Sequence, residues 1–140
     1  MEKQKILIAD DSEMNRALLV DILEDQYDIV EADNGAAAID LLTQCGGDFS
    51  LLLLDIMMPE MDGFEVLAYI NRYHLNDTLA VIMISADDSP ANIKRAYDLG
   101  AFDYISRPFD AAIVRRRISN TMLLYARQRH LEKIITEQFY

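Results

Sequence analysis

The sequence predicts a single α/β domain in three layers, with five parallel strands between two layers of helices. Three observations lead to this fold class. The chain has 140 residues, which is enough for one domain with a hydrophobic core of its own. Five short apolar segments alternate with segments of helical pattern, an order typical of a parallel sheet with right-handed crossovers. No repeat and no linker rich in Gly, Pro or Ser divides the chain.

The predicted strands are short apolar runs that end at polar residues. Residues 51–54 are four leucines in a row, which is typical of a strand buried on both faces. Residues 27–31 instead alternate between apolar and polar side chains, as expected for a strand with one buried face. In chain order, the strands are expected at residues 5–9, 27–31, 51–54, 80–84 and 101–105.

Helix-start signals follow the predicted strands. Ser12 and the Ser89-Pro90 pair are residue types favoured at the cap and first turn of a helix. Asp62 and Glu65 have the spacing of a capping box. In chain order, the helices are expected after Ser12, over residues 36–42, after Asp62, from Pro90 to Gly100 and from Phe109 onward.

The last helix is expected to be longer than the sheet needs. No Gly or Pro interrupts residues 109–139, and a continuous helix of that length extends about 45 Å. Its second half carries an apolar stripe that includes Leu124, Leu131 and Ile135. We therefore expect a domain over residues 1–121 and a helical extension over residues 122–140. The extension either folds back on the domain, pairs with another copy, or leads toward an output domain missing from this chain; we favour the last two.

Composition and charge exclude several classes of protein. The net charge is −11, so the chain is a poor candidate for binding nucleic acid or an anionic membrane. The acidic residues are concentrated in residues 1–106, whereas residues 107–140 are basic on balance. The apolar runs are too short to span a membrane, and no secretory signal begins the chain. The single cysteine, Cys45, cannot form an internal disulfide, which fits a reducing, cytoplasmic setting. Its side chain is expected to be partly buried.

Polar side chains follow the predicted strands at their carboxyl ends. Asp10 and Asp11 follow the first strand, Asp55 the third and Ser85 the fourth, and Arg107 comes just after the fifth. Each residue alone could be a helix cap, but together they are expected at one edge of the sheet. Three carboxylates in one crevice repel unless a cation is present, and oxygen ligands favour Mg²⁺. A hydroxyl and a guanidinium opposite them would suit a phosphate.

These motifs resemble the receiver domain of bacterial two-component response regulators over about residues 3–121. The resemblance implies a flavodoxin-like fold with the strand order 2-1-3-4-5. The matching motifs are Asp10-Asp11, Asp55 in Leu-Leu-Asp-Ile-Met-Met-Pro-Glu-Met-Asp-Gly, Ser85-Ala86, and Arg107-Pro108-Phe109.

The resemblance also implies a phosphorylation site. Asp55 would accept a phosphoryl group from the histidine of a sensor kinase or a phosphotransfer protein. Asp10, Asp11 and Asp55 would hold Mg²⁺ together with the backbone carbonyl of Met57. The domain would catalyse its own phosphorylation and dephosphorylation and would not be an enzyme with a separate substrate.

A conformational switch is implied beside that site. Ser85 would bond a phosphoryl oxygen, and Tyr104 would turn inward as Ser85 moves. The fourth helix, fifth strand and fifth helix would then present a changed surface to a partner. Asp103 and Arg117 occupy positions that resemble a family dimer contact, so a homodimer through this face or through the C-terminal helix is a possible assembly.

Arg107 departs from the family pattern, which usually has lysine there. Arginine is bulkier and planar, so the exchange is not conservative in a tight site. The alternative is a pseudo-receiver, a protein-interaction or dimerisation module that works without phosphorylation. A phosphohydrolase of the haloacid-dehalogenase type would need Asp-x-Asp on the first strand, and a flavodoxin would need a phosphate-binding loop there. The Arg107-Pro108 bond resembles a family position that is often cis. No helix-turn-helix fits in the chain, so no direct nucleic-acid binding is expected.

Overall fold

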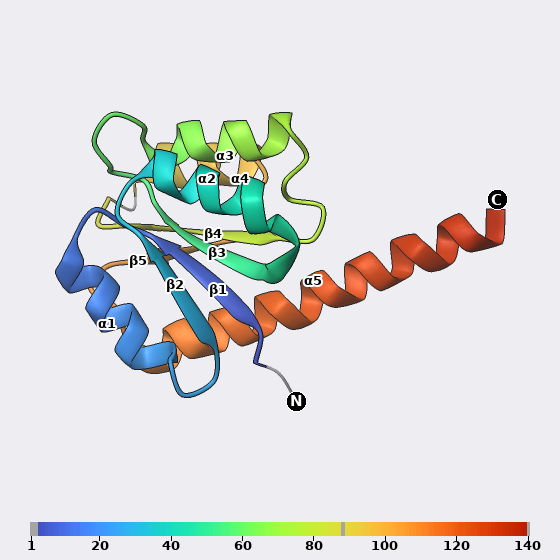
Figure 1. Cartoon of the computed structure of the whole chain (residues 1–140), viewed down its shortest axis with the longest axis horizontal. Helices are drawn as coiled ribbons and strands as arrows, with labels where there is room; N and C mark the ends of the chain where they lie inside the picture. Colours follow the sequence, from blue (N-terminus) through green and yellow to red (C-terminus); the bar gives the residue numbers. More distant parts are fainter. Residues whose placement is uncertain (1–2, 88, 140) are drawn as a thin grey trace.

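The structure, a computed structural model, describes residues 3–87 and 89–139 and is built around one parallel sheet (Figure 1). The strands lie in the order β2-β1-β3-β4-β5, and every neighbouring pair is parallel. The predicted fold class and strand order are therefore confirmed. The strands are β1 (Lys5–Ala9), β2 (Asp28–Ala32), β3 (Phe49–Asp55), β4 (Ala80–Ser85) and β5 (Asp103–Ser106).

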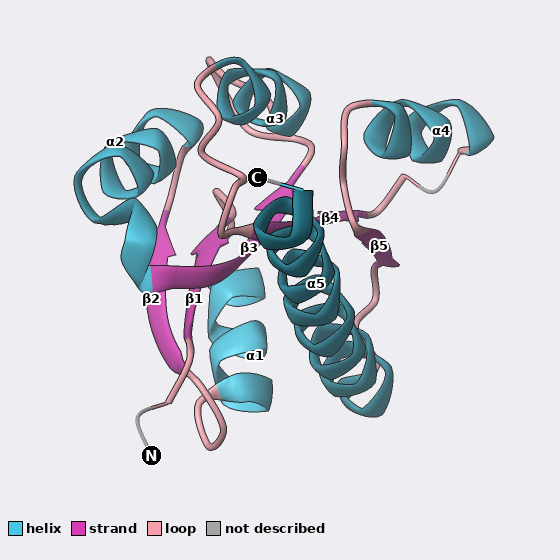
Figure 2. Ribbon diagram, turned by 90° about the vertical axis from the view of Figure 1, so that its right-hand side faces the viewer, coloured by secondary structure: helices cyan, strands magenta, loops and turns pink. Residues whose placement is uncertain are grey.

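Helices cover both faces of this sheet. Figures 1 and 2 show α2, α3 and α4 on one face and α1 and α5 on the other. A short 3₁₀ helix, η1 (Gly46–Asp48), follows α2. The α-helices are α1 (Glu13–Leu23), α2 (Gly35–Cys45), α3 (Gly63–Arg72), α4 (Pro90–Asp98) and α5 (Ala111–Phe139). Among the described residues, none of the helices has the length and apolarity needed to cross a bilayer.

Side-chain caps start three of the helices where the sequence predicts them. The Ser12 hydroxyl accepts a hydrogen bond from the amide of Asn15, at 3.3 Å, which caps α1. Ser89 caps α4 in the same way. At α3, Asp62 and Glu65 form both bonds of the capping box. These caps fix the polar loops that connect the sheet edge to the helices.

The alternation of strand side chains gives the molecule two apolar layers. In β1, Ile6 and Ile8 face α1 and α5, whereas Leu7 faces α2 and α3. The four leucines of β3 divide in the same way and are fully buried. A strand covered on both faces has no room for polar side chains until it ends. The first polar residues after β1 and at the end of β3 are therefore held at one rim of the sheet.

Two expectations about individual segments are wrong. The fifth strand begins at Asp103 and not at residue 101, because Ala101 is part of the turn that closes the end of α4. Its amide donates to the carbonyl of Ala96, and Gly100 takes a φ of 97°, as in a glycine-terminated helix cap. Cys45 is exposed at the end of α2, and was expected to be partly buried.

The long α5 combines a packed half and a projecting half. Val114, Ile118 and Met122 are buried against the sheet. The ring of Tyr125 packs edge-on against Phe102, with centroids 5.8 Å apart, and its hydroxyl donates to a backbone carbonyl of the α3–β4 loop. Past this point the helix extends away from the domain (Figure 1).

Candidate phosphoacceptor and metal site

Three carboxylates meet at the carboxyl edge of the sheet. Asp10 follows β1 and Asp55 ends β3, and these two strands are neighbours. Both side chains are buried, while Asp11 is exposed at the rim. Each of the three offers a carboxylate oxygen within 4.8 Å of the others. The predicted convergence is therefore present, and the all-oxygen ligand set fits a hard divalent cation.

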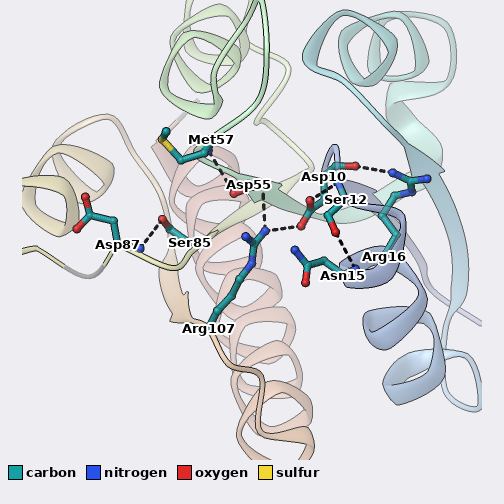
Figure 3. Close-up of polar contacts among 9 residues, drawn as sticks. All are labelled: Asp10, Ser12, Asn15, Arg16, Asp55, Met57, Ser85, Asp87 and Arg107. Carbon is teal, nitrogen blue, oxygen red and sulfur yellow. Dashed lines mark hydrogen bonds and ion pairs between the residues drawn. The ribbon is translucent and has the colours of Figure 1, made fainter.

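Backbone amides hold the two buried carboxylates in place. The amide of Ser12 donates to Asp10 Oδ1 at 2.9 Å, and the amide of Met57 donates to Asp55 Oδ1 at 3.2 Å (Figure 3). The backbone of Met57 thus lies next to the Asp55 carboxylate, with which it was expected to share a metal ion. The side chain of Met57 is exposed. Each aspartate keeps its Oδ2 directed toward the centre of the site.

Arg107 supplies the positive charge at that centre. Its Nη2 lies 2.5 Å from Asp10 Oδ2 and 3.1 Å from Asp55 Oδ2. Its backbone amide donates to the carbonyl of Ser85, so the residue enters the site from the end of β5. The peptide bond between Arg107 and Pro108 is cis. The structure therefore places Arg107 against the carboxylates, in ion pairs with two of them.

Asn15 is a neighbour of Arg107 that the sequence analysis did not single out. The side-chain amide of Asn15 faces the guanidinium of Arg107; turned so that its oxygen takes the place of the nitrogen drawn in Figure 3, it accepts from Nη1 at 3.3 Å and from Nη2 at 3.2 Å. Figure 3 shows this side chain reaching from the first turn of α1 toward Arg107. The Phe109 ring lies on another side, with its centroid 5.9 Å from the guanidinium carbon. The two residues are 92 positions apart in the sequence and meet only in the folded chain, so no local sequence pattern reveals this contact.

The pKa of Asp55 is raised from 3.8 to about 6, and burial is the largest cause. The charge of Asp10 also raises this pKa, because two adjacent carboxylates resist simultaneous ionisation. The charge of Arg107, the amide of Met57 and the hydrogen bond from Arg107 oppose this rise. A cation at the site would favour the ionised carboxylate, which is the nucleophilic form.

The glycine that starts α3 permits a close approach behind Asp55. A Cβ atom on Gly63 would lie 2.3 Å from the backbone carbonyl oxygen of Asp55 and 2.8 Å from Ile56 Cα. The Gly63 amide donates to the carbonyl of Ile56 at 2.8 Å. The loop after Asp55 therefore returns onto its own strand, and only a residue without a side chain fits there. In the sequence, this glycine is visible only as the last residue of the Asp55 motif, which does not reveal its steric role.

Arg16 fixes the loop after β1 from the opposite side. Its Nη1 donates to the carbonyl of Asp10 at 2.8 Å, and its Nε pairs with Glu31 at 3.2 Å. This contact joins the Asp10 backbone to β2. The sequence analysis missed Arg16 too, because its partners come from different strands.

Ser85 and Tyr104 lie on the α4 side of the site. Ser85 is buried, and its hydroxyl accepts from the amide of Asp87 at 3.0 Å. The side chain of Tyr104 is buried, and its hydroxyl donates to the carbonyl of Asp87. Both predicted switch residues therefore contact the same β4–α4 loop, and Tyr104 lies inward.

Asp103 and Arg117, the predicted dimer contact, pair within one chain. Arg117 Nη1 lies 3.5 Å from Asp103 Oδ1, and the hydroxyl of Tyr97 donates to the same oxygen at 3.2 Å. Arg117 also donates to the carbonyl of Tyr104. These contacts connect α4, β5 and α5 across one face.

Comparison with known proteins assigns the family. Residues 6–119 match the response regulator receiver domain. The chemotaxis protein CheY of Halobacterium salinarum is 35% identical over 123 residues, which cover 87% of this chain and 98% of that protein. A probable cyclic di-GMP phosphodiesterase of Vibrio cholerae is 35% identical over 113 residues, but the match covers 81% of this chain and only 25% of that protein.

A solved structure gives the same result. The CheY chain in the crystal structure of the CheX-CheY-BeF3-Mg²⁺ complex from Borrelia burgdorferi superposes with a TM-score of 0.78 at 30% identity. The superposition covers 83% of this chain and 87% of that one. This CheY-like family is one of signalling domains and not of classical enzymes. The chain belongs to the response regulator receiver domain family of two-component signalling.

Proposed function

We propose that the chain is a phosphorylation-dependent switch and that Asp55 is its phosphoacceptor. The observation that carries the proposal is the meeting of three carboxylates and a guanidinium where the strand order reverses. An Oδ atom of Asp55 forms a bond to the phosphorus of a phosphohistidine donor as the P–N bond breaks. The electron pair of that bond leaves with the imidazole, which takes up a proton.

Asp10, Asp11 and Asp55 are the residues that would hold Mg²⁺, together with the backbone carbonyl of Met57. The oxygen-only ligand set and the close spacing of the three carboxylates, two of which are buried, support this assignment. When bound, the cation would offset the negative charge on both the carboxylate and the incoming phosphoryl group. The Borrelia CheY complex, which includes Mg²⁺, adds support from a relative.

Ser85 and Tyr104 are proposed to transmit the change. A phosphoryl oxygen would take a hydrogen bond from the Ser85 hydroxyl, which now accepts from the amide of Asp87. Because Tyr104 also bonds to the backbone of Asp87, a shift of this loop would reach β5 and α4 directly. The phosphoryl group would thereby favour one of two arrangements of the α4–β5–α5 face.

The proposed donor is a sensor histidine kinase or a phosphotransfer protein. The chain spans only a quarter of the Vibrio phosphodiesterase it matches, and we propose that in a longer protein of that kind the switch would act on an output domain. We also propose a homodimer through the α4–β5–α5 face or through the projecting half of α5, where Leu131 and Ile135 are 59% and 56% exposed.

Intact mass after incubation with acetyl phosphate and Mg²⁺ tests the proposal. We expect one added phosphoryl group on the native chain and none on an Asp55→Asn variant or after adding EDTA beforehand. Labelling that persists in Asp55→Asn would show that the acceptor is another residue.

The pseudo-receiver is the second candidate, and the ion pairs of Arg107 with Asp10 and Asp55 favour it. In that case neither acetyl phosphate nor a cognate kinase would modify the chain. An Arg107→Lys variant distinguishes the two cases, because modification that appears only with lysine would identify the arginine as the block.

A further inference from the structure

Every carboxylate oxygen of the two buried aspartates already has a hydrogen-bond or ion-pair partner. Asp10 accepts from the Ser12 amide at Oδ1 and from Arg107 at Oδ2. Asp55 accepts from the Met57 amide at Oδ1 and lies 3.1 Å from Arg107 at Oδ2. The guanidinium thus occupies the oxygens that point into the centre of the site.

We propose that Arg107, held by Asn15, is a resident counter-cation of this site that a divalent metal ion must displace. The inference rests on the proposed function, since it concerns the metal site of the proposed switch. Asn15 is then a positioning residue: it holds the guanidinium in place and thereby lowers the affinity of the site for the metal ion.

Geometry places the two cations in competition for the same carboxylate oxygen. Mg²⁺ binds carboxylate oxygens at about 2.1 Å. An ion bound to Asp10 Oδ2 would lie within about 5 Å of Nη2, which is 2.5 Å from the same oxygen. Two positive charges at that distance in a buried site repel strongly, because little water screens them. Arg107 must therefore leave Asp10 when the metal ion binds.

Asn15 stabilises the closed position of Arg107. With its amide turned so that the oxygen faces the guanidinium, Asn15 bonds both terminal nitrogens, including the Nη2 that pairs with the carboxylates. Phe109 packs against the same group. Lysine could not make this set of contacts, since an ammonium is a single point of charge without a planar edge. A hydrogen bond to a charged group is among the stronger ones in proteins.

Calorimetric titration with MgCl₂ of the full chain tests the clamp. We expect Asn15→Ala to bind Mg²⁺ about threefold to tenfold more tightly than the native chain, because one charged hydrogen bond no longer opposes release. Arg107→Lys should bind more tightly too, although its net charge is unchanged, which separates the clamp from a general electrostatic effect. Met14→Ala is the matched control, since Met14 is the neighbouring residue of α1 and is 74% exposed.

A second measurement follows the guanidinium itself. The Nε of Arg107 is buried and has no hydrogen-bond partner among the described residues, so its N–H signal reports on its position. In ¹H–¹⁵N spectra we expect this signal to move as Mg²⁺ is added, over the same concentration range as the calorimetric transition. In Asn15→Ala it should move at lower Mg²⁺ concentrations.

The outcomes separate the clamp from the proposed metal site. Equal affinities for the native chain and Asn15→Ala, or an Arg107 signal unmoved at saturation, would overturn the clamp and leave the metal site intact. Binding that Asp11→Asn does not weaken would instead overturn the proposed metal site. Absence of Mg²⁺ binding in every variant would overturn both.

Discussion

At the residue scale, Asp55 is held in an environment that opposes its own charge. It is 1% exposed and lies beside Asp10, and among the described residues only Arg107 compensates it with a full positive charge. A pKa of about 6 means that the folded chain binds a proton more tightly than the unfolded chain does. In the absence of metal, ionised Asp55 therefore lowers the stability of the fold.

The Asp55→Asn variant should consequently be more stable than the native chain in EDTA at pH 7.5. The native chain loses stability as pH rises from about 4 to about 6, because the unfolded carboxyl ionises first, and the loss is complete above that window. The difference amounts to about 3 kcal/mol at most. Urea unfolding at pH 4 and pH 7.5 measures it, and the stabilisation should be small at pH 4.

Asp77→Asn is the control for removing one charge from an acidic protein, because Asp77 is exposed in the α3–β4 loop. A gain of the same size in Asp77→Asn, or a gain in Asp55→Asn that is independent of pH, would contradict the burial argument.

The sequence predicts the three carboxylates of the site better than the residues that support them. Asp10, Asp11 and Asp55 could be predicted because each follows a recognisable strand, and parallel strands end at one edge. Asn15 and Arg16 could not, because their roles depend on partners that come from other elements. A hydrogen bond across the fold leaves no local pattern in the chain.

At the element scale, strand and helix types follow from local pattern, whereas their ends depend on hydrogen bonds. The predicted helix starts at Ser12, Asp62 and Ser89 are confirmed because a cap is a contact between near neighbours. The start of β5 was misplaced because the amide of Ala101 is used by the end of α4. Apolar composition does not distinguish these two uses of a residue.

The start of α3 gives a sharp test of backbone packing. Gly63→Ala should lower the free energy of unfolding by about 3 kcal/mol, because the new Cβ would meet backbone atoms that cannot rotate away. Gly47→Ala is the matched control, since a Cβ there would have no atom within 4 Å. Urea midpoints for the two variants provide the comparison. Equal losses would show that the α3 loop can retreat from Asp55.

The packed length of α5 can be measured by truncation. A chain that ends at residue 121 should lose about 2–4 kcal/mol relative to one that ends at residue 128, because it lacks Met122 and the ring of Tyr125. Thermal unfolding of both forms, compared with the full chain, gives the difference. If both shortened forms matched the full chain, the domain would be complete by residue 121.

At the scale of the whole molecule, the net charge is −11, and three carboxylates are concentrated at the carboxyl edge of the sheet. Adding Mg²⁺ should raise the melting temperature by several degrees, since binding at a hundredfold excess over Kd contributes about 2.7 kcal/mol. NaCl at equal ionic strength should give a smaller rise, because it only screens the net charge. Asp11→Asn should keep the fold but lose the Mg²⁺-specific part of the rise in melting temperature. Differential scanning calorimetry measures the melting temperatures of the native chain and the variant in both salts.

The uninterrupted course of α5 also has a mechanical consequence. The helix packs against the domain up to Tyr125 and continues without a break to Phe139. The part after Tyr125 is a projecting arm of about 20 Å. A stiff arm amplifies rotation at its root, so a tilt of roughly 10° at the packed end would carry the tip through about 3–4 Å. Displacements of an ångström or less beside β5 would thereby become movements large enough to change which side chains meet at the far end of the arm.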